Sequence, residues 1–249
     1  MTLIISHVTN LNFACVTSDT MMRTVLTDPT KVLGDDDKYT SDIEERDKSS
    51  LLTDNVIISE SGLADITEAV IRQLEKKIKR NMFLEDCIPL LKESRKEVEE
   101  IYSKDPFFAN NISGPYYTIT LTGFYDNERT GQVTLDHFGV SSRICEDPLQ
   151  NKSISGVMVN SPTQDIEDLV ETFKNLLYEA ADYEELFDYY ENIHTLVAAT
   201  HPEMVSATFK RLLLFKDEQG KIVNQTVTKD LSEKVDYYKK ALSSIKQDK

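Results

Sequence analysis

The hydrophobic positions along the chain follow two different periods, which predict strands in some segments and helices in others. Residues 2–8 and 12–20 are β-branched apolar runs on either side of a short turn, a pattern typical of a hairpin. Residues 116–125 and 130–138 form a second such pair around a polar turn. Further strands are predicted at residues 54–59, 156–160, 208–215 and 221–228.

Apolar residues at three- and four-residue steps predict helices between and after these strands. The clearest series is Leu63, Ile66, Val70, Leu74 and Ile78. Similar stripes predict helices at residues 85–102, around 166–177, at 184–199 and around 235–245. The polar segment at residues 27–50 contains an acidic run and is predicted to be a long loop or an exposed hairpin.

The order of predicted elements is strands, two helices, strands, two helices, strands and a final helix. This order fits neither a regular alternation of strands and helices nor an all-β protein. Two antiparallel sheets packed face to face, with helices on the outside, would bury every apolar stripe. The sequence therefore predicts an α+β fold. Because no internal repeat and no linker rich in Pro, Gly or Ser is present, residues 1–249 are predicted to form a single domain.

Composition narrows the classes of function. The 249 residues carry a formal net charge of -15 at pH 7, and because such a surface repels phosphate backbones, nucleic acid is not an expected partner. No apolar run approaches the roughly 18 residues that a membrane helix needs, and the N-terminus lacks the features of a signal peptide. Three widely spaced cysteines suit a reducing compartment. We therefore expect a soluble cytoplasmic protein without a membrane partner.

The sequence offers no pattern for a metal or a cofactor. The histidines are isolated from one another and from the cysteines, so they lack the spacing of metal ligands. They are His7, His137, His194 and His201. A glycine-rich phosphate loop is also lacking. We therefore expect neither a metal nor a cofactor.

Two landmarks in the first quarter of the chain indicate a different kind of chemistry. The chain opens with MTLIIS and its second predicted strand runs through FACVTSD, which places Thr2 at the start of one strand and Asp19 at the end of the next. Lys48 lies fourteen residues before Gly62, the glycine that precedes the first predicted helix.

Two more landmarks lie in the second half of the chain. The segment AATHPEMVSATF carries an acid, Glu203, and a serine three residues later, Ser206. Ser161 follows the short strand predicted at residues 156–160. Together with the strand pair YYTITLTGFYDNERTGQVTLDHFG, the landmarks and their order resemble those of proteasome β-subunits and bacterial HslV-type peptidases, members of the N-terminal-nucleophile (Ntn) hydrolase superfamily.

This resemblance implies both a fold and a site. The fold is a four-layer αββα sandwich. The nucleophile is the hydroxyl of Thr2 after removal of Met1. A Met that precedes a small residue is normally removed in the cytosol. Lys48 favours the ionised hydroxyl, Asp19 orients Lys48, and the N–H of Gly62 donates to the developing oxyanion. The supporting polar residues that the resemblance implies are Glu203, Ser206 and Ser161.

The function implied is that of a threonine-dependent amide hydrolase or peptidase, acting on a peptide or amide substrate and assembled as a homo-oligomer. A regulatory ATPase partner cannot be read from the sequence. A catalytically inactive protein of the same fold, with a structural or interaction role, stays open as an alternative. Leu63 stands where the family usually has a small residue, and Glu203 replaces its usual Asp. An unrelated acidic α+β binding protein is a third interpretation.

Overall fold

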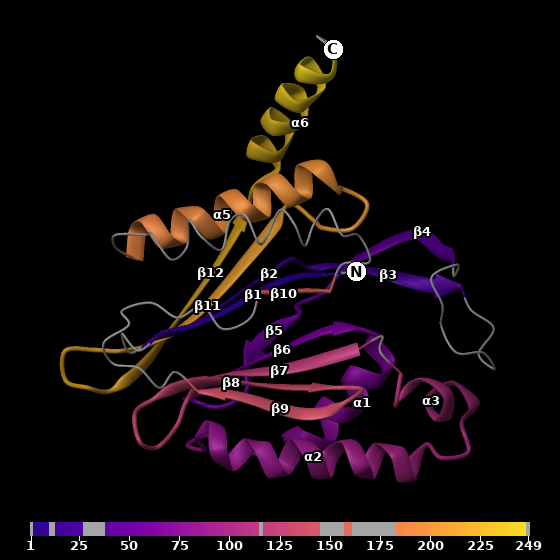
Figure 1. Ribbon diagram of the computed structural model, residues 1–249, viewed down its shortest axis with the longest axis vertical. Coiled ribbons are helices and arrows are strands. Elements are labelled where there is room, and N and C mark those ends of the chain that lie inside the picture. The colour runs from indigo at the N-terminus through magenta and orange to yellow at the C-terminus, as the bar shows by residue number, and fades with distance from the viewer. Residues whose placement is uncertain are drawn as a thin grey trace.

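The computed structural model describes residues 2–9, 13–26, 38–114, 117–144, 157–160 and 183–247. The backbone alone is described at residues 2, 9, 23–26, 38–43, 143–144, 157–160, 183 and 245–247. Two antiparallel sheets lie face to face in the middle of the molecule, and helices cover their outer faces (Figure 1). The predicted α+β sandwich with helices outside is confirmed.

The first sheet contains both the N-terminal hairpin and the last hairpin of the chain. Its strand order is β10 (Val157–Asn160), β1 (Thr2–Thr9), β2 (Phe13–Ser18), β11 (Thr208–Lys216) and β12 (Ile222–Asp230). All neighbouring strands run antiparallel. The N-terminus of β1 therefore starts inside the sheet, between β10 and β2, rather than at its edge.

The second sheet is a meander. Its strands follow the order β5 (Ser49–Leu51), β6 (Val56–Gly62), β7 (Tyr117–Phe124), β8 (Thr130–Asp136) and β9 (Gly139–Ile144). Neighbouring strands are again antiparallel. The connection from β6 to β7 is long because it contains the helices that cover this sheet.

The helices lie on the two outer faces of the sandwich (Figure 1). On the second sheet lie α1 (Ala64–Glu75) and α2 (Leu84–Ile101), followed by the short α3 (Pro106–Asn111). On the first sheet lies α5 (Tyr183–Thr200), and α6 (Ser232–Gln247) projects beyond it toward the C-terminus (Figure 1). In the described part of the chain, no helix is long and apolar enough to cross a membrane.

Three hydrophobic clusters fill the spaces between the layers. In β1, Leu3 and Ile5 belong to the cluster with α5, while Ile4 and Val8 belong to the cluster between the two sheets. Because successive side chains of a strand point to opposite faces, a strand in the middle of a sandwich needs apolar residues at nearly every position. The third cluster lies between the second sheet and the helices α1 and α2.

Some predicted elements differ from the structure. The polar segment at residues 27–50 contributes to a two-stranded ribbon of β3 (Met21–Leu26) and β4 (Lys38–Glu45), followed by β5. The sequence pattern predicted neither β3 nor β5, and it also missed α3. The helix predicted around residues 166–177 lies outside the described residues. The prediction of a single domain stays a prediction.

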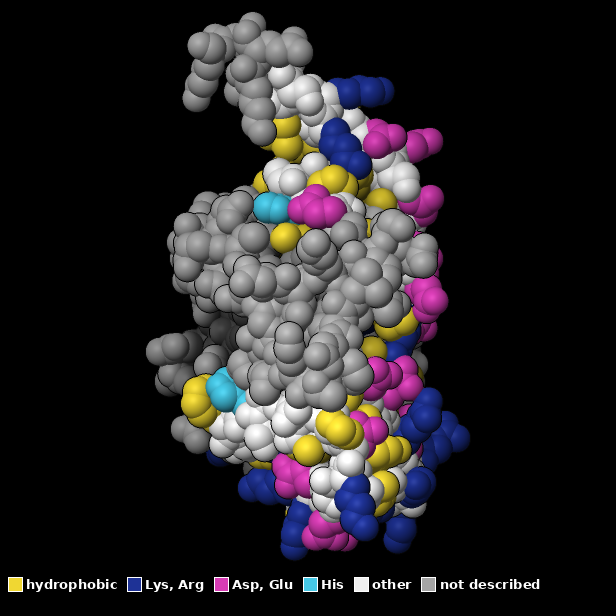
Figure 2. Space-filling model, turned by 90° about the vertical axis from the view of Figure 1, so that its right-hand side faces the viewer, with side chains coloured by type: hydrophobic (Ala, Val, Ile, Leu, Met, Phe, Trp, Pro, Cys, Tyr) yellow, Lys and Arg dark blue, Asp and Glu magenta, His cyan; other side chains and the backbone are white. Residues whose placement is uncertain are grey.

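Charged residues of both signs cover the outer helical layer. Figure 2 shows Lys and Arg side chains at the lower end of the molecule, where α1 and α2 lie, with Asp and Glu among them. Lys77 and Glu97, for example, form an ion pair of 2.9 Å. The acidic net charge therefore does not make this end uniformly negative.

Candidate active site

The end of β2 brings Asp19 to the beginning of β1. The N–H of Leu3 donates to Oδ1 of Asp19 at 3.0 Å, and the N–H of Asp19 donates to the carbonyl of Leu3 at 3.1 Å. Thr2 is the residue before Leu3 and pairs with Asn160 of β10. The backbone of Thr2 therefore adjoins Leu3, the residue whose N–H binds the Asp19 carboxylate.

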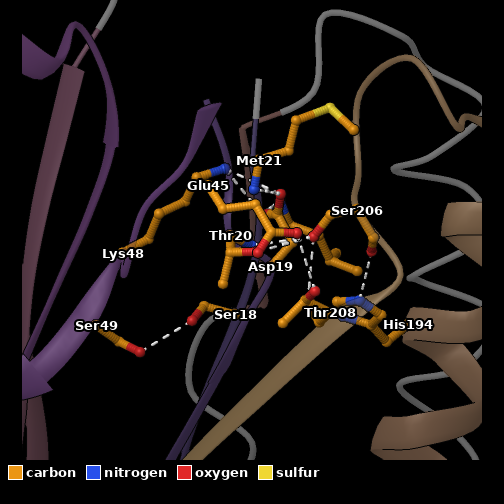
Figure 3. A network of polar contacts seen from close by, with 11 residues as sticks. Ser18, Asp19, Thr20, Met21, Glu45, Lys48, Ser49, His194, Ser206 and Thr208 are labelled. Atoms are coloured by element: carbon orange, nitrogen blue, oxygen red, sulfur yellow. Dashed lines mark hydrogen bonds and ion pairs between the residues drawn. The ribbon is translucent and has the colours of Figure 1, made fainter. Parts of the chain in front are cut away.

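Lys48 forms a buried ion pair with this carboxylate. It lies between β4 and β5, and its Nζ is 3.0 Å from both Oδ1 and Oδ2 of Asp19 (Figure 3). The N–H of Met21 donates to Oδ2 at 3.0 Å. The side chain of Asp19 is fully buried and that of Lys48 is 8% exposed. Lys48 is thus an interior residue, in contrast to the exposed ion pair that its charged sequence neighbours would suggest.

Burial is the main influence on the Lys48 ammonium. It lowers the pKa of Lys48 below its usual range, because a charged group loses water on transfer into the interior. The Asp19 carboxylate acts in the opposite direction, by its charge and by its hydrogen bonds, and so offsets part of this decrease. The pair therefore holds a cation whose proton is more easily removed than that of a surface lysine.

Ser206 lies on the other side of Asp19, in the loop before β11. Its Oγ accepts a hydrogen bond from the N–H of Thr20 at 3.2 Å and is 3.1 Å from the Thr20 hydroxyl. It also donates to the carbonyl of Thr208 at 3.3 Å. Ser206 thereby fixes the backbone immediately after Asp19 (Figure 3).

His194 of α5 completes this polar region (Figure 3). Its Nε2 is 2.9 Å from the carbonyl oxygen of Ser206. Burial lowers the pKa of His194, and although the Asp19 charge counteracts this effect, the net direction is toward the neutral imidazole. A neutral ring that donates from Nε2 anchors the Ser206 loop to the helix layer.

Three contacts join the residues on either side of Lys48 to strands of the first sheet. The hydroxyls of Ser18 in β2 and Ser49 in β5 are 2.9 Å apart, and both residues are buried. Lys210 of β11 donates to the carbonyl of Ser49 at 2.9 Å and pairs with Asp47 at 2.8 Å. These contacts fix the backbone on both sides of Lys48 and so fix the path of its side chain.

Gly62 occupies the turn from β6 into α1. Its φ of +89° lies in the left-handed region, which glycine adopts without the penalty that other residues pay. Two residues earlier, the N–H of Glu60 donates to the carbonyl of Lys48 at 2.9 Å, so the end of β6 runs beside the Lys48 backbone. Glycine is therefore required here by the backbone itself.

The remaining predicted residues are less closely gathered. Glu203 is half exposed, and among the described residues its one ion pair is with His201, at 3.7 Å. Ser161, Met1 and the Thr2 side chain lie outside the described residues. Asp19, Lys48 and Ser206 are thus brought together with the Thr2 backbone, whereas Glu203 is not bonded to them.

Sequence reasoning missed several residues of this region. Its spacing sets His194 apart from the other histidines, and no motif marks Ser18, Thr20 or Ser49. Their partners are 12 to 186 positions away along the chain. Only the position of Thr20 next to Asp19 could have drawn attention to it, because hydroxyl residues are common throughout the chain.

Comparisons with known proteins support the fold. Neither a protein-family model nor a curated protein matches the chain. Solved structures do match, among them an Anbu (Gly-1) mutant from Hyphomicrobium sp. strain MC1, with a TM-score of 0.58 and 11% identity over 99% of this chain and 97% of that one. Anbu (ancestral beta-subunit) from Yersinia bercovieri has a TM-score of 0.61 and 11% identity, over 98% and 96%. The chain therefore has a proteasome-β-like Ntn fold, and at this identity the likeness concerns the fold alone.

Proposed function

We propose that this protein is a threonine-dependent amide hydrolase, with Thr2 as its nucleophile after removal of Met1. The observation that supports it most strongly is the buried Lys48–Asp19 pair at the start of β1, bonded to the backbone of Leu3. A buried ion pair costs desolvation free energy, and replacing it by apolar residues is often neutral or stabilising. A buried ion pair with a shifted lysine pKa, bonded to the backbone next to Thr2, therefore favours a role in chemistry.

The proposed reaction needs one residue to act as both nucleophile and base. The Thr2 hydroxyl attacks the substrate carbonyl, and the free α-amine takes up its proton. An α-amine has a reference pKa of about 7.7 to 8.0, which suits proton transfer near neutral pH. The Lys48 ammonium favours the ionised hydroxyl, and the N–H of Gly62 donates to the oxyanion. The intermediate collapses as its C–N bond breaks, and the α-ammonium gives its proton to the amine that leaves. Water, with the α-amine again as base, then hydrolyses the acyl-enzyme.

The roles of the remaining residues follow from their contacts. Asp19 holds Lys48 with two hydrogen bonds and the start of β1 with one. Ser206 positions Thr20 and with it the end of β2. We include Glu203 and Ser161 in the proposed site on the resemblance alone. We further propose a cytoplasmic, single-domain protein that assembles as a homo-oligomer, for which the name "beta-subunit" of one structural neighbour is the support.

A panel of fluorogenic peptides tests this function. The wild-type protein, with Met1 absent by N-terminal sequencing, should hydrolyse at least one peptide of the panel. Thr2→Ala should lower kcat/KM by about 10³-fold or more, because the nucleophilic hydroxyl is lost although the α-amine remains. Thr226→Ala, an exposed threonine of β12, is the matched control and should leave the rate unchanged. Full activity in Thr2→Ala would refute the mechanism.

One observation favours the alternative of an inactive protein with a structural role. Glu203 is half exposed and turned to His201 instead of the Lys48–Asp19 pair. A folded protein that retains Met1 and hydrolyses none of the peptides would support this alternative.

A further inference from the structure

The proposed active site is divided between the two sheets. Thr2 begins β1 and Asp19 follows β2, both in the first sheet, whereas Lys48 directly precedes β5 of the second sheet. The cluster between the sheets consists of apolar side chains, and apolar packing is not directional. A small displacement of one sheet along the other would therefore move the main chain of Lys48 relative to Thr2, unless polar contacts fix it.

Lys210 of β11 provides such contacts from the first sheet. Its ammonium donates to the carbonyl of Ser49 at 2.9 Å and pairs with the Asp47 carboxylate at 2.8 Å. These two residues are the sequence neighbours of Lys48, so one side chain holds the main chain on both sides of it. Lys210 also lies opposite Ser18 in the strand pairing, and the hydroxyl of Ser18 is 2.9 Å from that of Ser49 (Figure 3). The segment around Lys48 is therefore tied to β2 and β11 at adjacent points.

The hydrogen bond to Ser49 is the stronger of the two contacts that Lys210 forms. Ser49 is buried, and a buried carbonyl that loses its donor is costly. The Asp47 side chain is 66% exposed, and ion pairs at the surface contribute little. Lys210 itself is buried, so water competes poorly for its ammonium. Lys210 thus acts on the main chain next to Lys48.

We propose that Lys210 is a positioning residue, which holds Lys48 at the distance from Thr2 that the reaction needs. The inference rests on the proposed function, because it adds a residue to the same site. Misplacement of a reacting group by about 1 Å can lower a rate by about 10²-fold. A displaced Lys48 would stabilise the ionised hydroxyl less in the transition state, so kcat and kcat/KM should decrease together while KM changes little.

Lys216, at the other end of β11, is a closely matched control. The side chains of Lys210 and Lys216 are 10% and 11% exposed, and each pairs at 2.8 Å with an exposed carboxylate, that of Asp47 or that of Glu128. The two lysines are about 20 Å apart along the strand. Lys210→Met and Lys216→Met should both lower the urea midpoint, because each removes a largely buried ammonium from the same strand. Only Lys210→Met should also lower kcat, by about tenfold or more.

Two further variants separate positioning from stability. Lys210→Arg keeps a cation with several donors and should regain most of the lost kcat. Lys210→Gln ends one bond earlier and carries no charge, so it provides the comparison with Lys216→Gln if Lys210→Met does not fold. An equal loss of kcat in the variants of both lysines, or no loss in the variants of Lys210, would overturn the inference.

Hydrogen exchange tests the position of Lys48 without any substrate. The N–H of Glu60 donates to the carbonyl of Lys48 at 2.9 Å, so exchange of this amide shows whether the carbonyl stays in place. Lys210→Met should accelerate this exchange by about tenfold or more, and Lys216→Met should leave it unchanged. Unchanged exchange in Lys210→Met would show that Lys210 does not hold the Lys48 segment.

The two readouts separate this inference from the proposed function. Hydrolysis by the wild type that Lys210→Met leaves unaffected contradicts the positioning role and leaves the hydrolase proposal standing. A wild type that hydrolyses no peptide contradicts the proposed function. In that case, exchange at Glu60 that is faster in Lys210→Met alone supports the hold of Lys210 on the Lys48 segment, and exchange that is equal in both methionine variants overturns it.

Discussion

At the scale of single residues, the charged neighbours of Lys48 in the sequence do not indicate that its side chain is buried. Arg46 and Asp47 precede it directly, and a run of charged residues normally indicates a solvated surface. In the structure the three side chains have different partners. Arg46 pairs with Glu60, Asp47 with Lys210, and Lys48 with the buried Asp19. Asp19, the buried partner of Lys48, is 29 residues away in the sequence. The sequence could therefore indicate Lys48 as a candidate residue, but it could not indicate that Lys48 is buried.

A double-mutant cycle measures this pair. Lys48→Met and Asp19→Asn should each lower the free energy of unfolding by about 3 kcal/mol or more, because each leaves an uncompensated buried group. The double variant removes both charges and should be less destabilised than the sum of the single changes by more than about 1 kcal/mol. Urea denaturation provides the measurement.

The control is an exposed pair of the same chemistry. Lys96 and Glu100 on α2 are 3.8 Å apart, with side chains 76% and 69% exposed. The cycle of Lys96→Met and Glu100→Gln should give a coupling of only a few tenths of a kcal/mol. A coupling equally small for Lys48 and Asp19 would mean that the buried pair is not formed in solution.

His7 is a second buried titratable residue and gives the protein a predicted pH dependence. Its Nδ1 is hydrogen-bonded to the Tyr190 hydroxyl, and burial lowers its pKa from 6.5 to about 3. Well above pH 6.5 the imidazole is neutral in both states, and its titration contributes nothing. As the pH falls through 6.5, His7 binds a proton in the unfolded chain but not in the folded protein. The free energy of unfolding therefore decreases until about pH 3.

The size of this effect can be measured above the sequence pI of about 4.7. Between pH 7.5 and 5.5, His7 should account for a loss of about 1.4 kcal/mol in the free energy of unfolding. His7→Gln, which retains a hydrogen-bonding group but does not titrate, should lose that much less over the same interval. Identical pH profiles for wild type and His7→Gln would show that His7 is not buried as described.

At the scale of elements, strand pairing in the second sheet depends on a glycine. Gly123 of β7 faces Val56 of β6, and a Cβ built on it would lie 2.2 Å from the carbonyl oxygen of Asn55 and 2.9 Å from the Val56 Cα. Both atoms belong to the backbone, so no side-chain rotation relieves the contact. The close approach of β6 and β7 at this point therefore requires glycine.

Substitution of this glycine should be more harmful than that of a glycine in a turn. Gly123→Ala should lower the free energy of unfolding by about 3 kcal/mol, because the two strands must separate. The control is Gly220→Ala in the turn before β12, where φ is +77° but no atom lies within 4 Å of the added Cβ. It should cost only about 1 kcal/mol of backbone strain. A reversed order in urea denaturation would contradict the packing of β6 on β7.

Elements with a strong hydrophobic period could be predicted, and elements without one could not. The stripe from Leu63 to Leu74 gave α1, and the run from residue 2 to residue 8 gave β1, because both bury apolar faces. Strand β4 has the polar sequence KYTSDIEE, and β3 is the short run MMRTVL, so neither shows a regular alternation of apolar and polar residues. Strand β5 is only three residues long, too short for any pattern to show.

At the scale of the whole molecule, the order of elements predicted two sheets with helices outside, since this arrangement buries every apolar stripe, and the resemblance implied the αββα sandwich. Part of the candidate site could be predicted from this fold, because the sandwich places Asp19 and Lys48 next to the start of β1. The polar surroundings did not follow. Ser206 was predicted through the resemblance, but His194 meets the Ser206 loop only because α5 packs there, and nothing in the sequence marks this histidine.

The most direct test of the central claim is mass spectrometry of the protein after reaction with a β-lactone, an electrophile that acylates activated hydroxyls. The protein is expected to lack Met1 and to carry a single acyl group, which fragmentation places on Thr2. Thr2→Ala should remain unmodified under the same conditions. Retention of Met1, or an acyl group on another residue with Thr2 unmodified, would contradict the assignment of Thr2 as the nucleophile.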